Sequence, residues 1–269
     1  MLLTFSHPKP SKLYKFIAIV ITLCLLEACT SQADYQLAAE EDHPEEITKS
    51  LDEAEQLFSH RSDGDNLRKA VMLVGRLRNP NKRNFEVEWK FAKYSYFLGK
   101  AEKNQDKAAE IFERGEDAAR IAARVESEKP DGHFWFAANL GELSKMSPLT
   151  VGLKSVDELR ESMEKVIALE PGYQGASAFD ALGQLEMSTR NFKGGKTEMA
   201  IQYYEKGISL APDNSNLRLH LAEAYFALRR DADARKQIDT IISMKPNNEF
   251  AAEHQLAVAK AKELLSKNF

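Results

Sequence analysis

Apolar residues recur along most of the chain at the three- and four-residue spacing of helices. Gly and Pro are few, 13 and 9 in 269 residues, which fits long helices joined by short turns. No segment alternates between apolar and polar residues over many positions, as a half-buried strand would. The pattern therefore predicts an all-α protein. In residues 196–210 the stripe consists of Met199, Ala200, Tyr203, Tyr204 and Ile208.

The predicted helices fall into pairs that repeat. Residues 134–171, 176–212 and 214–246 each contain an aliphatic residue followed by a small one in the first helix, and each ends in Pro. Small residues let two helices approach closely, and Pro cannot continue a helix. This order of features resembles the tetratricopeptide repeat (TPR), a helix–turn–helix unit of about 34 residues. The aliphatic–small pairs are Leu140-Gly141, Leu182-Gly183 and Leu221-Ala222.

Two weaker hairpins, residues 47–80 and 84–129, precede these units, and a helix rich in Ala and Lys follows over 249–267. We therefore expect a TPR-like α-solenoid of about five helical hairpins over residues 47–269, closed by a C-terminal capping helix. Insertions at 144–152 and 189–196 lengthen the middle units. Within this pattern, Asp180 and Glu186 fall near a helix face that should be buried. Asp131, and Asp213 followed by Asn214, are expected helix caps.

The N-terminus has the layout of an export signal. Residues 1–15 carry three Lys and no acidic residue, and residues 16–26 are uninterruptedly apolar but shorter than the roughly 20 residues of a membrane-spanning helix. Leu26-Glu27-Ala28-Cys29 resembles the lipobox of bacterial lipoproteins, although Glu27 stands where a small residue is usual. The resemblance implies cleavage before Cys29 and lipidation of its sulfur. An ordinary secretory signal is the alternative.

We accordingly expect a signal peptide at residues 1–28, a flexible acidic tether at 29–46, and a membrane attachment through the N-terminal lipid. The protein would lie in the cell envelope and face the periplasm. Thr30, where Asp would resemble an inner-membrane retention signal, favours the outer membrane. The mature chain would hold 34 basic and 40 acidic residues, a formal net charge of −6, which argues against nucleic acid as a partner.

No set of residues predicts catalysis, a metal site or a cofactor. No thiol besides Cys29 remains after cleavage, and the histidines are scattered without the spacing of a helical zinc site. Gly194-Gly195-Lys196-Thr197 lacks the strand and the earlier Gly of a phosphate-binding loop. The Gly-x-Ser-x-Gly elbow of hydrolases is also missing. We therefore predict that the protein is not an enzyme.

Residues 130–143, PDGHFWFAANLGEL, together with residues 147–176 and the Gly-rich stretch 192–196, look like the T component associated with TRAP-type (tripartite ATP-independent periplasmic) transporters. This resemblance implies a TPR-like lipoprotein that binds a periplasmic solute-binding protein and contains a groove for a ligand. An adaptor in outer-membrane or peptidoglycan assembly complexes is the alternative. Solenoid edges can also stack, so a homo-oligomer stays open.

One helix face within this segment is unusually polar. Trp135, Asn139 and Glu142 are spaced i, i+4 and i+7, so they share a face, and His133 precedes them. The indole, the amide and the carboxylate of these residues could contact and hydrogen-bond a peptide or a polar ligand. We predict that these four residues bind the partner or ligand. Alternatively, Trp135 packs against residues 147–156, Asn139 and Glu142 bond the same loop, and His133 only begins the helix.

Overall fold

A computed structural model describes residues 44–245 and 250–269 of the chain. All regular structure in these residues is helical, which confirms the predicted all-α class. The predicted signal peptide, Cys29 and nearly all of the tether lie outside the described residues. The α-helices are α2 (Pro44–Ser59), α3 (Gly64–Leu77), α4 (Phe85–Ala101), α5 (Gln105–Val125), α6 (Pro130–Met146), α7 (Leu153–Leu169), α8 (Tyr173–Thr189), α9 (Thr197–Leu210), α10 (Ser215–Ala227), α11 (Asp231–Ser243) and α12 (Ala251–Asn268).

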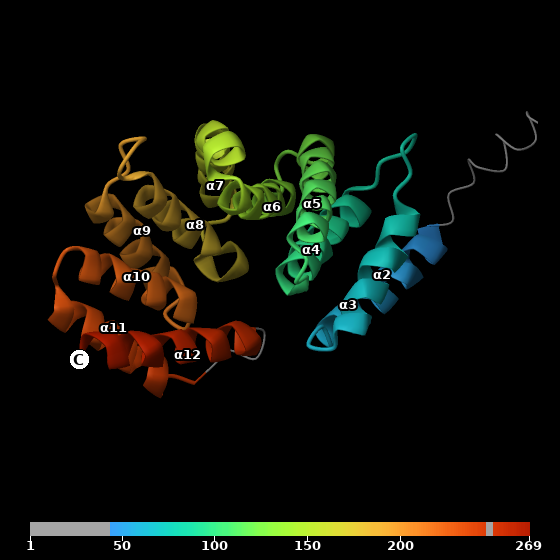
Figure 1. Ribbon diagram of the computed structural model, residues 1–269. Coiled ribbons are helices and arrows are strands. Elements are labelled where there is room, and N and C mark those ends of the chain that lie inside the picture. Colours follow the sequence, from blue (N-terminus) through green and yellow to red (C-terminus); the bar gives the residue numbers. More distant parts are fainter. Residues whose placement is uncertain (1–43, 246–249) are drawn as a thin grey trace, which may run out of the picture. The chain divides into compact units, whose positions relative to one another are not determined.

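Consecutive helices pack against one another from α3 to α11, and α12 packs against the last pair (Figure 1). The predicted arrangement of five hairpins and a final helix is thus confirmed. Residues 50–269 form one compact unit. Ala257 and Ala261 of α12 are buried in the same apolar cluster as Ile238 and Ile241 of α11, so the last helix covers the end of the core. No described helix is both long and apolar enough to cross a bilayer.

Glycines set how closely the helices approach one another. A methyl group built on Gly183 of α8 would lie 2.2 Å from the ring of Tyr204 on α9, far inside a van der Waals contact. The same addition on Gly207 of α9 would lie 2.7 Å from Leu217 on α10. Gly141 on α6, at the repeat position of Gly183, has open space instead. The close approach predicted from the repeat pattern therefore holds within α8–α10.

Short turns join the helices of each hairpin. The first insertion forms a π-helical turn, η1 (Pro148–Gly152), directly before α7. The second turns through Gly194, whose φ of 79° falls in the left-handed region that favours glycine. Asp131 does not cap α6, contrary to prediction. Pro130 begins that helix after Lys129, so Asp131 falls inside the first turn, where its carboxylate accepts a 2.7 Å hydrogen bond from the Tyr173 hydroxyl.

Asn214 fixes the position of α10 relative to α8. Of the predicted capping pair Asp213 and Asn214, it is Asn214 whose side-chain oxygen accepts the backbone N–H groups of Asn216 and Leu217. Its side-chain nitrogen donates to the carbonyl of Gly175, 2.7 Å away, in a left-handed turn at the start of α8. The side-chain amide of Asn214 therefore caps α10 and also ties this helix to α8.

Candidate partner-binding site

Two of the four residues predicted to bind a partner lie inside the fold. Trp135 is 3% exposed and packs on the rings of Tyr96 and Phe97, with centroid distances of 5.7 and 6.0 Å. Asn139 is fully buried and donates to the carbonyl oxygens of Ala92, at 3.2 Å, and Trp135, at 2.7 Å. These contacts hold α6 against α4 rather than against residues 147–156. A binding role for Trp135 and Asn139 stays a prediction.

The other two residues are partly accessible. His133 is half-buried, and its Nε2 lies 2.9 Å from the carbonyl oxygen of Ser127 in the turn before α6. Glu142 is paired with Lys145 at 2.9 Å and with Lys100 of α4 at 3.4 Å. Of the predicted four, Glu142 is therefore the residue that joins a wider polar surface.

That surface repeats along the first helices of successive hairpins. Glu142 directly follows the aliphatic–small pair of α6, and Gln184 and Glu223 occupy the same position on α8 and α10. We call the set Glu142, Lys145, Asp180, Gln184, His220 and Glu223 the first-helix face. Of these six, the sequence analysis predicted a binding role for Glu142 alone. The triplets Leu-Gly-Glu, Leu-Gly-Gln and Leu-Ala-Glu carried the signal for Gln184 and Glu223.

Direct contacts connect α8 and α10 on this face. Asp180 accepts hydrogen bonds on both carboxylate oxygens: His220 Nδ1 lies 2.6 Å from one, and Gln184 Nε2 lies 2.8 Å from the other. The sequence analysis noted Asp180 as an acid near a buried helix face. The structure explains it, because a buried carboxylate is tolerated when it is paired and hydrogen-bonded. His220, 40 residues away, supplies the pairing.

A pocket of about 320 Å³ opens beside this pair, where α8, α9 and α10 meet. Polar groups and one thioether form its walls. Gln184 and His220 come from the first-helix face, and Tyr204 comes from the second helix of the hairpin. The lining residues are Gln184, Met187, Ser188, Arg190, Tyr204, His220 and Glu223.

A paired acid lies beside the pocket, and an acid without an ion pair among the described residues lines it. Burial alone would lower the pKa of His220, but the adjacent Asp180 carboxylate outweighs it and raises this pKa above its ordinary value. Glu223 also favours the charged imidazole, and Lys145 opposes it. Glu223 itself has no ion pair among the described residues. The pocket therefore holds one carboxylate that the described part of the chain does not neutralise.

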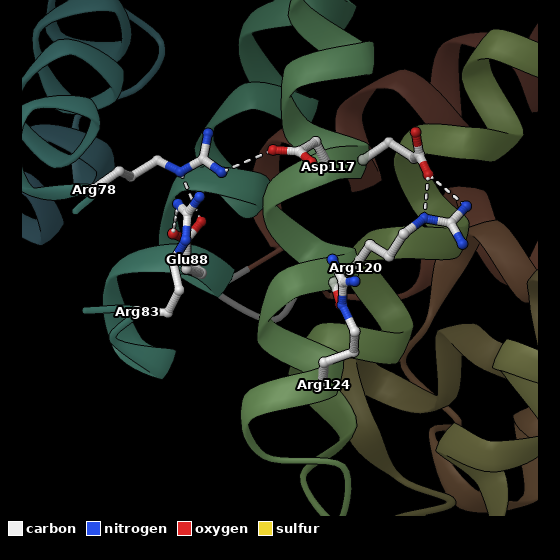
Figure 2. A network of polar contacts seen from close by, with 7 residues as sticks. Arg78, Arg83, Glu88, Asp117, Arg120 and Arg124 are labelled. Atoms are coloured by element: carbon white, nitrogen blue, oxygen red, sulfur yellow. Dashed lines mark hydrogen bonds and ion pairs between the residues drawn. The ribbon is translucent and has the colours of Figure 1, made fainter. Parts of the chain in front are cut away.

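A second cluster of charges lies around α3–α5. Unlike Glu223, its acidic residues are all paired with arginines. Figure 2 shows Glu88 of α4 enclosed by Arg78 and Arg83, at 2.6 and 2.8 Å, with Arg78 reaching on to Asp117 at 3.1 Å. Arg120 is paired with Glu116 and Glu158, both at 2.8 Å. The contacts of Arg78 and Arg83 fasten the turn after α3 to α4 and α5, and Arg120 joins α5 to Glu158 of α7. The carboxylate of Glu88 has both oxygens occupied and offers neither to a ligand.

The described residues contain no group of three or more His, Cys, Asp or Glu side chains placed to hold a metal ion. The Asp180–His220 pair has one hydrogen-bonded amide beside it and no nucleophile within hydrogen-bond distance among the described contacts. What this arrangement offers is hydrogen bonding and charge, which suits recognition.

Comparison with known proteins agrees with the fold. A family model described as "Regulator of microtubule dynamics protein 1-3" matches residues 50–193, and a tetratricopeptide repeat model matches residues 192–261. A search of curated proteins found no match. Neither matching model is that of the TRAP T component, so this resemblance stays a prediction.

The chain also resembles solved structures, among them two TPR-like folds. TTC0263, a thermophilic TPR protein of Thermus thermophilus, has a TM-score of 0.60 and 14% identity, over 80% of this chain and 98% of its own. MamA has a TM-score of 0.50 and 18% identity, over 74% of this chain and 91% of its own. At these identities the likeness shows the fold alone: a TPR-type helical repeat protein, a class that generally serves as a protein-interaction scaffold. Because the first family match spans more than half of the sequence, the chain belongs to the regulator of microtubule dynamics protein 1-3 family.

Proposed function

We propose that the protein is a non-enzymatic scaffold of the cell envelope that binds a segment of a partner protein on its first-helix face. The observation that carries this proposal is the recurrence of polar side chains at one repeat position, ending at the open pocket beside Gln184, His220 and Glu223. Solenoid proteins use such repeated surfaces for extended contacts. A lipid on Cys29 would hold the scaffold at the membrane.

The partner is proposed from the sequence. The segment 130–143 favours a periplasmic solute-binding protein of a TRAP-type transporter, and an outer-membrane or peptidoglycan assembly complex is the second candidate. The family name refers to microtubule dynamics for its named members. From the family and from the TPR fold we carry over only the binding of a protein partner.

A crosslinked pull-down from the native envelope, read by mass spectrometry, tests the binding surface. Gln184→Trp should block the pocket and abolish capture of the partner, because the new indole fills the space between α8 and α10. Glu198→Trp is the matched control, since Glu198 is exposed on α9 and does not line the pocket.

Loss of a solute-binding protein in Gln184→Trp alone would support the transport partner. Loss of assembly or cell-wall proteins in that variant alone would support the adaptor. Equal capture by parent, Gln184→Trp and Glu198→Trp would overturn binding at this face.

Metabolic labelling with an alkyne-tagged palmitate tests the anchor. The parent and Cys24→Ser should both carry the label and sediment with membranes, because Cys24 lies inside the predicted apolar stretch of the signal. Cys29→Ser should lose both properties. Labelling that survives in Cys29→Ser would show that the predicted lipobox is wrong.

A further inference from the structure

The repeat position directly after the aliphatic–small pair holds an acidic residue on both α6 and α10. This residue has a basic ion-pair partner on α6, but among the described residues it has none on α10. On α6, Glu142 has Lys145 three residues later, 2.9 Å away. On α10, the residue three positions after Glu223 is Phe226, and on α8 the residue three after Gln184 is Met187. Residues three apart are neighbours on a helix, so no cation follows Glu223 as Lys145 follows Glu142, and the basic neighbour before it is His220.

The rest of the pocket does not supply one either. The imidazole of His220 is already paired with Asp180, with Nδ1 2.6 Å from the carboxylate. Arg190 is exposed, and its guanidinium donates to the carbonyl of Met187 at 2.6 Å. Within the described residues no ion pair joins Arg190 to Glu223. The carboxylate of Glu223 therefore lines the pocket without an ion pair of its own among the described residues.

The neighbouring groups add acceptors to this carboxylate. Gln184 uses its amide nitrogen on Asp180, which leaves its side-chain oxygen without a hydrogen bond among the described contacts. The hydroxyl of Tyr204 likewise has no hydrogen bond within the described part of the chain, while burial and the nearby Asp180 and Glu223 raise the pKa of Tyr204 above its ordinary range. Met187 contributes a flexible thioether that packs well against aliphatic stems.

We propose that this pocket receives a lysine or arginine side chain of the partner protein, with Glu223 as its counter-charge and Met187 against its aliphatic stem. The proposal rests on the proposed function, since it names the chemistry of the same partner. A ligand cation would take the place that Lys145 holds beside Glu142. An arginine would be favoured, because its planar guanidinium can bond a carboxylate and an amide oxygen together.

An acidic side chain is the opposite possibility, because His220 and Arg190 are also at the pocket. Glu223 disfavours it, since a ligand carboxylate in the same pocket would meet a like charge. The two possibilities predict opposite preferences for small probes. They can therefore be separated without knowing the partner.

The test is an NMR titration of the full mature chain carrying ¹³C-labelled methionine methyl groups. The Met187 methyl is assigned by its disappearance in Met187→Leu. The probes are N-acetyl-arginine methylamide, N-acetyl-norleucine methylamide and N-acetyl-glutamate methylamide. We expect saturable shifts of the Met187 methyl with the arginine probe, weakened by added salt, and no saturation with the other two.

Two variants locate the charge. Glu223→Gln should weaken binding of the arginine probe about fivefold or more, whereas Glu198→Gln, at an exposed position of α9 that does not line the pocket, should bind as the parent does. The buried methyl of Met163 on α7 reports whether each variant is folded. Equal shifts with the norleucine probe, stronger binding of the glutamate probe, or unchanged binding in a folded Glu223→Gln would each overturn the proposal.

The two proposals fail separately. If the pull-down captures a partner that Gln184→Trp loses but Glu223→Gln retains, the first-helix face stands and the basic side chain is wrong. If no partner depends on Gln184 but the arginine probe still binds beside Glu223, the pocket chemistry stands and the scaffold role is wrong.

Discussion

Glu88 on α4 and Glu223 on α10 are both carboxylates of first helices, yet their surroundings differ completely. Glu88 is 1% exposed and has an arginine on each oxygen. Glu223 lines an open pocket and has no ion pair among the described residues. The α3–α5 region thus satisfies its acid within the chain, and the α8–α10 region does not.

The difference separates a structural charge from a candidate binding charge. A buried carboxylate is tolerated only when its partners repay the loss of water, and then removing one member leaves the others unpaired. A carboxylate in an accessible recess keeps part of its hydration and can exchange it for a ligand. Substitution should therefore cost stability at Glu88 and cost binding at Glu223.

The largest effect is expected for Glu88→Gln. The amide keeps the shape of the side chain but leaves the guanidinium groups of Arg78 and Arg83 close together without a shared anion. The free energy of unfolding should fall by about 3 kcal/mol. Urea denaturation followed by circular dichroism measures it.

Glu86→Gln is the control on the same helix, because Glu86 is exposed and has no ion pair among the described residues. It should change stability by less than about 0.5 kcal/mol. A loss below about 1 kcal/mol in Glu88→Gln would mean that the enclosed network does not stabilise α3–α5 in the way described.

Gly183→Ala and Gly141→Ala should act in opposite directions at one repeat position. The methyl group on residue 183 would collide with the Tyr204 ring at 2.2 Å, and this crowding should cost about 1–3 kcal/mol. At residue 141 there is open space, so alanine should gain about 0.5–1 kcal/mol through its helix propensity. Thermal unfolding of both variants measures the difference. A change in stability of the same sign in both variants would contradict the packing of α8 on α9.

These glycines also show what the sequence could and could not predict. Helix spacing, the aliphatic–small pairs and the closing prolines were enough for five hairpins and a final helix. The same local signals could not say that Trp135 and Asn139 face α4, because that depends on which neighbour covers the helix. Nor could they pair Asp180 with His220, since the contact spans 40 residues and requires α8 and α10 to be adjacent.

The Asp180–His220 pair should make stability depend on pH. Asp180 raises the pKa of His220 above its ordinary value of about 6.5, despite burial and Lys145, which act against it. A raised folded-state pKa gives stability that is complete below the unfolded-state pKa and is lost as the pH rises through the folded-state pKa. Stability of the parent should therefore fall above pH ~6.5 more steeply than that of His220→Gln.

Melting temperatures of the two proteins, measured side by side between pH ~5.5 and ~8.5, give this comparison. Other groups titrate in both proteins, so the difference between them isolates the histidine. Parallel curves would show that Asp180 does not hold a charged imidazole. A difference that grows toward low pH would agree with the geometry on α8 and α10.

The smallest effect is expected for the stability of Glu223→Gln. No described residue pairs with Glu223, so its removal breaks no ion pair, while the loss of its attraction to the His220 imidazole is offset by less repulsion from Asp180. We expect a change within about 0.5 kcal/mol in urea denaturation. Glu142→Gln, which loses the pairs with Lys145 and Lys100, should cost slightly more, up to about 1 kcal/mol. If Glu223→Gln instead destabilised the fold as much as Glu88→Gln does, its carboxylate would have a structural partner, and the contrast between the two regions would disappear.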